Sequence, residues 1–205
     1  MTDKENQVYG YNGKVLRVDL TGGKSTAEKI DTGLLRKYVG GATLGIKYLY
    51  DEVSPGTEWS DPANRLLLFS GPLGGTRVGG SGAIAVVTRG ALTNGVASTQ
   101  ANGFFGAFLR FAGFDGIILQ GAAPDWVYLY LHDGQAELKD ARHLTGKDTF
   151  EVEGAIREEL HKGGRELSIL SIGPAGESLV RFACIVVDTG HAAAHNHYFE
   201  LIHRR

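Results

Sequence analysis

Two carboxamide side chains lie directly before a predicted helix in the middle of the chain. Gln100 and Asn102 flank Ala101 and precede Gly103, and the apolar spacing that follows predicts a helix over residues 102–112. Backbone amides at a helix amino terminus, together with side-chain amides, commonly bind an anionic group of a ligand. Residues 100–103 are therefore a candidate ligand site. Four aromatic residues of this helix are expected in the core: Phe104, Phe105, Phe108 and Phe111.

Two glycine-rich segments resemble nucleotide-binding motifs but fail the tests of those motifs. Residues 80–85 (GSGAIA) match G-x-G-x-x-A but open a predicted strand, whereas a dinucleotide fingerprint follows a strand and opens a helix. Residues 23–25 (GKS) resemble the end of a P-loop, but Val18 stands where the first glycine is required. Ser81 lacks the second glycine of G-x-S-x-G and the strand-to-helix turn of that motif. Neither a nucleotide site nor a serine hydrolase is expected.

The thiol and imidazole groups give little indication of a metal site. Cys184 is the only cysteine and lies in the apolar run 182–187, where a buried structural cysteine is expected. Four of the seven histidines fall in the last fifteen residues, and His191 and His195 have the i, i+4 spacing that can chelate one metal on a helix. No cysteine and few carboxylates accompany them, so a solvated tail is favoured over a zinc site.

The composition excludes several classes of protein. The 205 residues include 21 Lys or Arg and 23 Asp or Glu, so no excess of positive charge favours nucleic acid. No run approaches the roughly 18 apolar residues of a membrane helix, and the polar first residues do not resemble a secretory signal. A single cysteine indicates a reducing, cytoplasmic setting. The 30 glycines are about twice the usual share of roughly 7%, which indicates close approaches of the backbone.

The elements that position these residues are predicted in two similar series. The first is a hairpin (13–19 and 25–30), a helix over 33–52 with a break or close contact at Gly40 and Gly41, a strand (65–70), a Gly-Pro loop (71–75), a glycine-rich loop (76–82), a strand (83–88), a polar loop (89–101), the helix 102–112 and a strand (117–120). The second is a hairpin (126–132 and 136–139), a helix (148–161), a strand (166–172), a Gly-Pro loop (173–176) and a strand (179–187).

This repetition predicts an internal duplication with a period near 105 residues, with halves at about 9–121 and 122–196 of a single domain over 1–205. Residues 197–205 form an atypical tail. The order mixes hairpins with crossovers, so the expected fold class is α+β with mixed β-sheets and a few helices, not a doubly wound parallel fold. Two related halves would place equivalent Gly-Pro loops about a pseudo-twofold axis, where a large pseudo-symmetric ligand fits.

Four ordered motifs carry a resemblance to a known family. They are residues 71–76 (GPLGGT), 100–107 (QANGFFGA), 110–116 (RFAGFDG) and 171–177 (SIGPAGE), preceded by the opening strand 15–20 (VLRVDL). Over about residues 9–196 the sequence resembles the amino-terminal domain of the aldehyde:ferredoxin oxidoreductase family.

The resemblance implies a duplicated base on which two molybdopterins carrying one tungsten or molybdenum ion sit, near a [4Fe–4S] cluster. It implies aldehyde, oxo or related acyl substrates, and ferredoxin or another electron-transfer subunit as partner. The expected cofactor-binding residues are Ser81, Gly82, Ala83, Gln100, Ala101, Asn102, Gly103, Asp188, His191 and Ala192. No catalytic residue is assigned within this chain.

Several positions depart from the aldehyde enzymes of that family. Ala83 and His191 stand where those enzymes have arginines, and Gln100 stands where they have an asparagine, which resembles the branch containing the tungsten-class benzoyl-coenzyme A reductases. The sequence has no Cys-x-x-Cys, and the family's cluster ligands lie in later domains. Beyond Asn196 the sequence leaves the family pattern. We therefore expect a truncated reading frame whose product is not catalytically competent alone.

Two alternatives to part of an oxidoreductase remain open. One is a stand-alone binding module that holds a pterin, a nucleotide or a partner subunit without redox turnover. The other is a structural remnant with an exposed apolar face where further domains would pack, which predicts poor solubility. Tungsten or molybdenum in the purified protein would favour the enzymatic interpretation.

Overall fold

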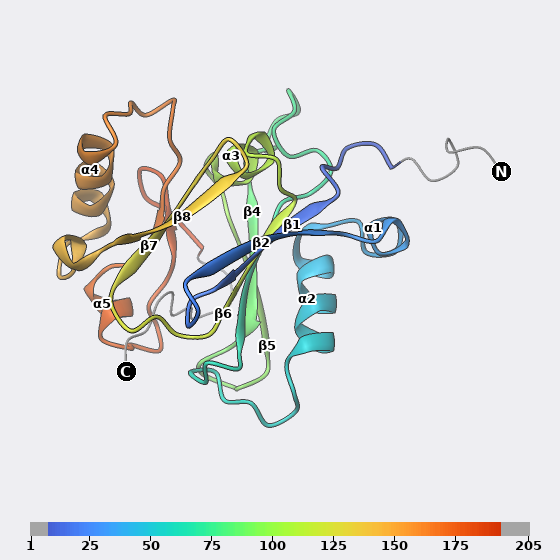
Figure 1. Cartoon of the computed structure of the whole chain (residues 1–205), viewed down its shortest axis with the longest axis horizontal. Helices are drawn as coiled ribbons and strands as arrows, with labels where there is room; N and C mark the ends of the chain where they lie inside the picture. Colours follow the sequence, from blue (N-terminus) through green and yellow to red (C-terminus); the bar gives the residue numbers. More distant parts are fainter. Residues whose placement is uncertain (1–7, 194–205) are drawn as a thin grey trace.

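The computed structural model describes residues 8–193, in which the chain forms an α+β fold with mixed β-sheet and a few helices, as the sequence predicts (Figure 1). In chain order the elements are β1 (Lys14–Asp19), β2 (Lys24–Lys29), α1 (Thr32–Tyr38), α2 (Gly41–Glu52), β3 (Arg65–Phe69), β4 (Ile84–Arg89), β5 (Val96–Ala101), α3 (Phe105–Phe111), β6 (Gly116–Gln120), β7 (Val127–His132), β8 (Gln135–Asp140), a 3-10 helix (Arg142–Leu144), α4 (Thr149–Glu159), β9 (Leu170–Ser171), α5 (Pro174–Glu177), β10 (Val186–Val187) and β11 (His191–Ala192).

The first half of the chain forms a six-stranded mixed sheet in the order β2-β1-β6-β3-β4-β5. Its last strand in the sequence, β6, lies in the middle, parallel to β1 and antiparallel to β3. The remaining neighbours pair antiparallel. The strands are apolar at nearly every position of β3, β4 and β6, as expected for a sheet covered on both faces.

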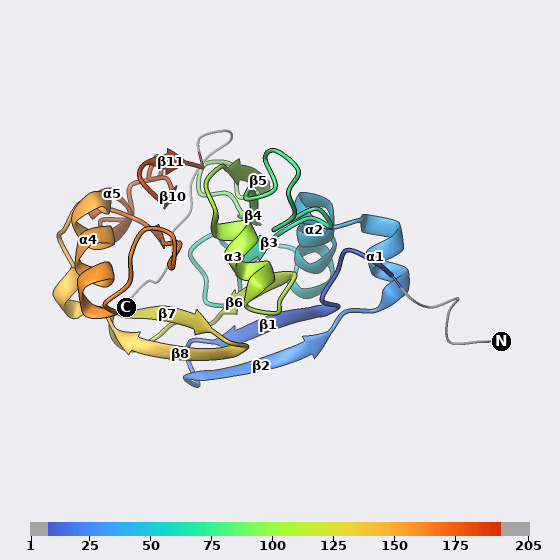
Figure 2. The ribbon, with the colours of Figure 1, turned by 90° about the horizontal axis from the view of Figure 1, so that it is seen from above.

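Alternate side chains of these strands enter two separate cores. Helices α1 and α2 cover one face, where Leu44 and Leu49 of α2 pack with Leu67, Phe69 and other residues of the sheet. Helix α3 and the second half of the chain cover the opposite face, seen from above in Figure 2. The shared core of that face includes Leu68, Leu109, Ile117, Ile185 and Val187. The sheet is thus the middle of three layers, and the two halves of the chain share one core.

At two places in or beside the sheet, a glycine allows the backbone to lie very close to another group. A Cβ on Gly116 would overlap the ring of Phe69, its partner on β3. The expected break in the first long helix is confirmed, since α1 ends at Tyr38 and α2 begins at Gly41. Gly40 has a φ of 144°, and a Cβ there would lie 3.0 Å from the carbonyl oxygen of Ser70. Only glycine can fill that position.

The motif at residues 110–116 has a structural role. The buried Asp115 carboxylate accepts hydrogen bonds from the backbone N–H groups of Asn12 (2.9 Å) and Gly13 (2.6 Å) and forms an ion pair with Arg110. The Arg110 guanidinium also donates to the carbonyl oxygen of Gly10 at 2.7 Å. These contacts attach the segment before β1 to the turn between α3 and β6.

The second half contains the predicted hairpin and helix but much less sheet than expected. Strands β7 and β8 turn at Asp133 and Gly134 and form a two-stranded sheet, while β11-β10-β9 form a separate antiparallel sheet. Helix α4 begins with a capping box, in which Asp148 accepts from the N–H of Glu151 and the Glu151 carboxylate accepts from the N–H of Asp148. Its apolar side packs on a small core of its own.

Several sequence-based expectations are wrong. The predicted polar loop 89–101 contains strand β5, the predicted strands 166–172 and 179–187 shrink to β9 and β10, and the predicted Gly-Pro loop at 173–176 contains the short helix α5. Cys184 is exposed, although its neighbours Ala183 and Ile185 are buried, so the side chain of Cys184 points away from the core that they enter. Of the four aromatic residues expected in the core, Phe104 and Phe111 are 62% and 67% exposed.

The duplication into halves at 9–121 and 122–196 stays a prediction. The atypical tail 197–205 and the histidines His195, His197 and His203 lie outside the described residues. Among residues 8–193, no helix has the length and apolar character needed to cross a membrane.

Candidate cofactor-binding site

Three segments that are distant in sequence meet at one end of strands β4 and β5. Ile84 pairs with Ala101, so the residues just before β4 and just after β5 lie side by side. The N–H of Gly106 donates to the carbonyl oxygen of Gly82 at 2.9 Å, and a Cβ on Gly82 would overlap the carbonyl oxygen of Gly103. The predicted segments 81–83 and 100–103 are therefore in direct contact.

The third segment, residues 188–192, reaches the same place from the second half of the chain. A Cβ on Gly103 would lie 3.0 Å from Val187, 3.1 Å from an Asp188 carboxylate oxygen and 3.5 Å from the His191 ring. The φ of Gly103 is 101°, which favours glycine. The structure thus brings together all three segments in which cofactor-binding residues were expected.

Asp188 has an internal role that the sequence did not indicate. Its side chain is buried, and its carboxylate accepts from the N–H of Phe104 (2.9 Å), the N–H of Ile169 (2.9 Å) and the hydroxyl of Ser168 (2.7 and 2.8 Å). These bonds join the loop before α3 to the segment before β9. The Asp188 carboxylate is thus bound within the protein and holds two segments of the site together, and its expected contact with a cofactor stays a prediction.

The expected anion site at the start of α3 is corrected. The helix has seven residues, and the N–H of Phe104 already donates to the Asp188 carboxylate while that of Gly106 donates to Gly82. The protein's own carboxylate therefore stands where an anionic ligand group was expected.

Ser81 also uses its side chain within the protein. Its hydroxyl donates to the carbonyl oxygen of Thr76 at 2.7 Å, and its own carbonyl oxygen accepts from the N–H of Gly75 at 3.0 Å. The glycine-rich loop before β4 is thereby closed on itself. Ser81, Gly82 and Ala83 are half-buried, so this segment presents mainly backbone to the surface.

The polar groups that remain available are Gln100, Asn102 and His191. All three residues are exposed, as is Ala192, and their side chains form no hydrogen bond with other residues in the range 8–193. Along β5, Ala101 belongs to the core that contains Val187, so Gln100 lies on the opposite face, beside Ala85 and towards α2. The structure therefore separates the Gln100 side chain from the side of the sheet on which His191 lies.

An exposed apolar rim beside the site was missed by sequence reasoning. Leu73 and Val78, in the segment between β3 and β4, are 57% and 52% exposed, while Phe104 directly precedes α3 and Phe111 is its last residue. A Cβ on Gly75 would contact the Phe111 ring, so the loop and the helix are adjacent. Helical spacing of aromatic residues predicts burial, and only the position of α3 on the sheet shows which of them stay exposed.

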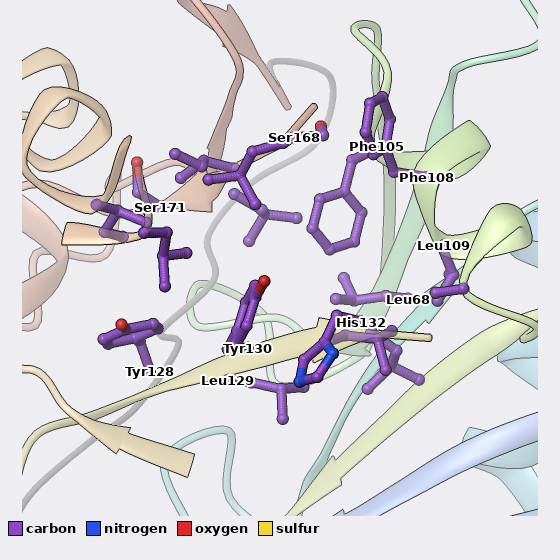
Figure 3. A pocket seen from close by; sticks show the side chains of 18 of the residues that line it. Leu68, Phe105, Phe108, Leu109, Tyr128, Leu129, Tyr130, His132, Ser168 and Ser171 are labelled. Atoms are coloured by element: carbon purple, nitrogen blue, oxygen red, sulfur yellow. The ribbon is translucent and has the colours of Figure 1, made fainter. Parts of the chain in front are cut away.

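A separate cavity of about 560 Å³ lies between α3, the β7–β8 hairpin and the segment around β9 (Figure 3). Side chains from the opposing elements, among them Phe105, Tyr130 and Leu68, project into it. None of the ten expected cofactor-binding residues lines the cavity. Ser168 links the two places, since it lines the cavity and donates to Asp188.

Charged groups lie in and beside the cavity, since Asp133, Lys162 and Glu166 line it together with Tyr128. The hydroxyl of Tyr128 donates to the Glu159 carboxylate at 2.7 Å, and His143 lies 3.1 Å from the other oxygen of that carboxylate. Burial, followed by the hydrogen bond to Glu159, raises the pKa of Tyr128 above its usual value. Among residues 8–193 there is no group of three or more His, Cys, Asp or Glu side chains that could hold a metal ion.

The donor set of the site suits a ligand recognised by hydrogen bonds. Carboxamides and imidazole offer both donors and acceptors, as the edge of a pterin requires, and neither carries a fixed charge. The close crossing of Gly82 and Gly103 leaves backbone without covering side chains at the surface. The residues present therefore fit the hydrogen-bonding edge of a molybdopterin-type cofactor, which Asn102 and His191 would bind.

Comparison with known proteins shows the family to which the chain belongs. The model of the family described as "Aldehyde ferredoxin oxidoreductase, N-terminal domain" matches residues 15–196. The chain is 42% identical over 187 residues to the tungsten-containing aldehyde ferredoxin oxidoreductase of Pyrococcus abyssi, an alignment that covers 91% of this chain and 30% of the relative. It is 35% identical to the aliphatic sulfonate oxidoreductase, WOR-like subunit, of Pyrococcus furiosus, over 93% of this chain and 32% of the relative.

The fold is also similar to a solved structure, the active site complex BamBC of benzoyl coenzyme A reductase in complex with 1,5-dienoyl-CoA. The TM-score is 0.83 at 34% identity, and the match covers 90% of this chain and 28% of the other. The chain thus spans about 30% of the length of the relatives it matches. With 182 of its 205 residues inside the family match, the chain belongs to the aldehyde ferredoxin oxidoreductase family and corresponds to its amino-terminal domain.

Proposed function

We propose that this domain binds a tungsten- or molybdenum-containing molybdopterin cofactor as part of an oxidoreductase acting on aldehyde, oxo or related acyl substrates. The observation that carries the proposal is the convergence of residues 81–83, 100–103 and 188–192 at one end of β4 and β5. Three segments up to about 100 residues apart meet there, and the Pyrococcus abyssi relative is named as a tungsten-containing enzyme.

Each part of the site has a distinct role in this proposal. Asn102 and His191 donate to and accept from polar groups of the cofactor, and the glycine backbone allows its flat ring system to approach. Asp188 holds the loop before α3 in position through the N–H of Phe104. The bound cofactor supplies the electron transfer.

The finer parts of the proposal concern what works together with this domain. A [4Fe–4S] cluster with ligands from later domains, ferredoxin or another electron-transfer subunit, and a cytoplasmic setting belong to the proposed full enzyme. We also propose that the 205-residue chain alone has no turnover. The purified chain should not reduce an artificial electron acceptor with any aldehyde, and turnover by the chain alone would contradict this point.

Metal and pterin analysis of protein expressed in an anaerobic host tests cofactor binding directly. The chain is purified alone and together with a co-expressed polypeptide that supplies the remaining family domains. Stoichiometric tungsten or molybdenum with a fluorescent pterin is expected in the second preparation. Absence of metal and pterin from both preparations would overturn the proposal.

Variants of the exposed residues test whether the proposed site itself, and not the stability of the whole chain, determines how much cofactor is retained. Asn102→Ala and His191→Ala should lower the retained metal and pterin several-fold without changing the unfolding midpoint, because both side chains are exposed. The control is Gln135→Ala, an exposed residue in the β7–β8 turn region. Equal cofactor content in all variants would contradict the proposed contacts.

A further inference from the structure

Three asparagines in the described part of the chain are followed directly by glycine, and their surroundings differ. The pairs are Asn12-Gly13 before β1, Asn94-Gly95 between β4 and β5, and Asn102-Gly103 between β5 and α3. An asparagine loses its side-chain amide when the backbone nitrogen of the next residue attacks it, and a following glycine hinders that attack least because it has no side chain. The fold decides at which of the three pairs these two groups can meet.

Both reacting groups of the first pair are bound within the protein. The backbone N–H of Gly13 donates to the buried Asp115 carboxylate at 2.6 Å. The side-chain amide of Asn12 donates to the carbonyl oxygen of Arg110 at 2.8 Å. For the Gly13 nitrogen to attack the Asn12 side chain, both of these hydrogen bonds must break, which costs free energy. The fold therefore opposes the reaction at Asn12.

The second pair is held in the turn between β4 and β5. The N–H of Asn94 donates to the carbonyl oxygen of Gly90 at 2.8 Å, and the N–H of Gly95 donates to the hydroxyl of Thr93 at 3.2 Å. The side-chain oxygen of Asn94 is buried and has no hydrogen-bond partner among the described residues. Water, which must complete the reaction, therefore has little access to this carboxamide.

The third pair is exposed and is not bound by such contacts. The Asn102 side chain forms no hydrogen bond with any residue in the range 8–193. The N–H of Gly103 has no acceptor in that range either, although the next N–H along the chain, that of Phe104, donates to the Asp188 carboxylate at 2.9 Å. Of the three pairs, Asn102-Gly103 therefore leaves both the attacking nitrogen and the carboxamide free and open to water.

The residue after Asn102 must be glycine for a reason unrelated to this reaction. The φ of Gly103 is 101°, and a Cβ there would lie 3.0 Å from Val187 and 3.1 Å from an Asp188 carboxylate oxygen. A side chain that would shield the neighbouring asparagine is thus excluded. The contact that brings the segments of the candidate site together also leaves Asn102 unshielded.

We propose that Asn102 is a site of spontaneous deamidation, which converts it to aspartate and isoaspartate in the folded chain. The Gly103 nitrogen loses its proton and bonds to the side-chain carbonyl carbon of Asn102, the bond from that carbon to the amide nitrogen breaks, and ammonia leaves with the proton. Water then opens the cyclic imide. Opening at one carbonyl gives aspartate, and opening at the other routes the backbone through the former side chain and gives isoaspartate. No oxidant or reductant takes part.

The reaction changes the charge and the backbone of the candidate site. A carboxamide that donates and accepts is replaced by a carboxylate that only accepts. The new negative charge lies one residue from the position that faces the Asp188 carboxylate. The modified chain also loses one hydrogen-bond donor for the cofactor, a consequence that rests on the proposed function, whereas the deamidation itself does not.

The test follows deamidation of the purified 205-residue chain during storage at neutral pH. Peptide mapping by mass spectrometry measures how much of each asparagine has become aspartate or isoaspartate, and it requires no cofactor. In the folded chain, Asn102 should react at least tenfold faster than Asn12 and Asn94. In concentrated urea, where the fold restrains none of them, the three asparagines should react at similar rates because each precedes a glycine.

The matched variant is Asn102→Gln. It keeps an exposed carboxamide at this position, but attack on glutamine must close a larger ring and is much slower. Modification at this position should be lost, while the rates at Asn12 and Asn94 stay unchanged. An isoaspartate-specific methyltransferase gives a second readout, since it should methylate the stored unmodified chain at least tenfold more than the stored variant.

Three results would overturn the proposal. Equal rates at the three pairs of the folded chain would mean that the fold does not select among them. Faster reaction at Asn12 or Asn94 would place the modification elsewhere, and reaction of Asn102 in urea but not in the folded chain would show that the loop before α3 restrains it. Unchanged metal and pterin content of a chain deamidated at Asn102 would support the deamidation and contradict only the cofactor contact of this residue.

Discussion

The two hairpins of the molecule have similar sequences of elements around them but different degrees of burial. In the first, Val15 and Val18 of β1 are 0% exposed, because β6 pairs beside them and α2 or the second half covers each face. In the second, every residue of β7 is half-buried, although the five residues 127–131 are all apolar or aromatic. The difference shows that a third, central strand converts an apolar hairpin into core.

The largest effect should come from the core of the first half. Phe69→Ala removes a fully buried ring from β3 and should lower the free energy of unfolding by about 3–5 kcal/mol. The matched variant in the second half is Phe150→Ala, whose ring is 63% exposed, and it should change the free energy of unfolding by less than about 0.5 kcal/mol. Urea unfolding of both variants measures the two losses of unfolding free energy. Equal losses would contradict the difference in burial between the two halves.

The junction between the halves should give the next largest effect. Asp188→Asn replaces a carboxylate that accepts from Phe104, Ser168 and Ile169, and the loss should be about 2–3 kcal/mol of unfolding free energy. Faster amide exchange at Phe104 and Ile169 should accompany it. Asp133→Asn, in an exposed turn, is the control. An unchanged exchange rate at Phe104 would mean that Asp188 does not hold the two halves together.

The ion pairs of Glu52 with Arg17 and Arg65 should make a smaller contribution to the free energy of unfolding, and this contribution depends on pH. The Glu52 carboxylate accepts from Arg17 (2.7 and 2.8 Å) and Arg65 (3.2 Å) at the end of the first sheet. Burial alone would raise the pKa of Glu52, but the hydrogen bonds and charges of the two arginines lower it below the usual 4.5. Glu52→Gln should cost about 1–2 kcal/mol at neutral pH.

The sign of the pH dependence follows from that lowered pKa. Because the unfolded state takes up the proton at higher pH than the folded state, the contribution of Glu52 is complete above about 4.5 and is lost as pH falls through the folded pKa. Unfolding curves of the unmodified chain and Glu52→Gln should therefore converge in acid. A difference that stays constant with pH would contradict the assigned ion pairs.

The smallest expected effect tests whether the second half unfolds with the first. Gly154 is an exposed residue within α4, and a Cβ there would meet nothing within 4 Å. Gly154→Ala should stabilise the helix by about 0.5–1 kcal/mol. If the halves unfold together, the whole transition shifts to higher urea. A shift seen only by exchange in α4 would show that the second half opens by itself.

Local signals in the sequence were enough to predict many of the elements. Asp133 and Gly134 predicted the turn of the second hairpin, Asp148 the start of α4, and Gly40 and Gly41 the break between α1 and α2. Each of these three predictions rests on the conformational preference of a few adjacent residues. The resemblance located the three segments of the candidate site, whose contacts the structure describes.

Features set by distant partners could not be predicted in the same way. Strand β5 contains Ser98, Thr99 and Gln100 and has the polarity of a loop, and its pairing with β4 makes it a strand. Cys184 lies in an apolar run, yet it is exposed because a single apolar run does not specify which face is covered. The role of Asp188 depends on Phe104, 84 residues away in the sequence.

The position of β6 in the middle of the sheet has a consequence for folding kinetics. Val15 of β1 pairs with Gly116, and the loop between them spans about 100 residues. Such long-range pairing slows folding, because the entropy of closing the loop is lost before the contacts form. During synthesis, β1 and β3 lack β6, the strand that pairs with both of them, until residue 120 has left the ribosome. We therefore expect translation pauses before that point to increase aggregation of the nascent chain.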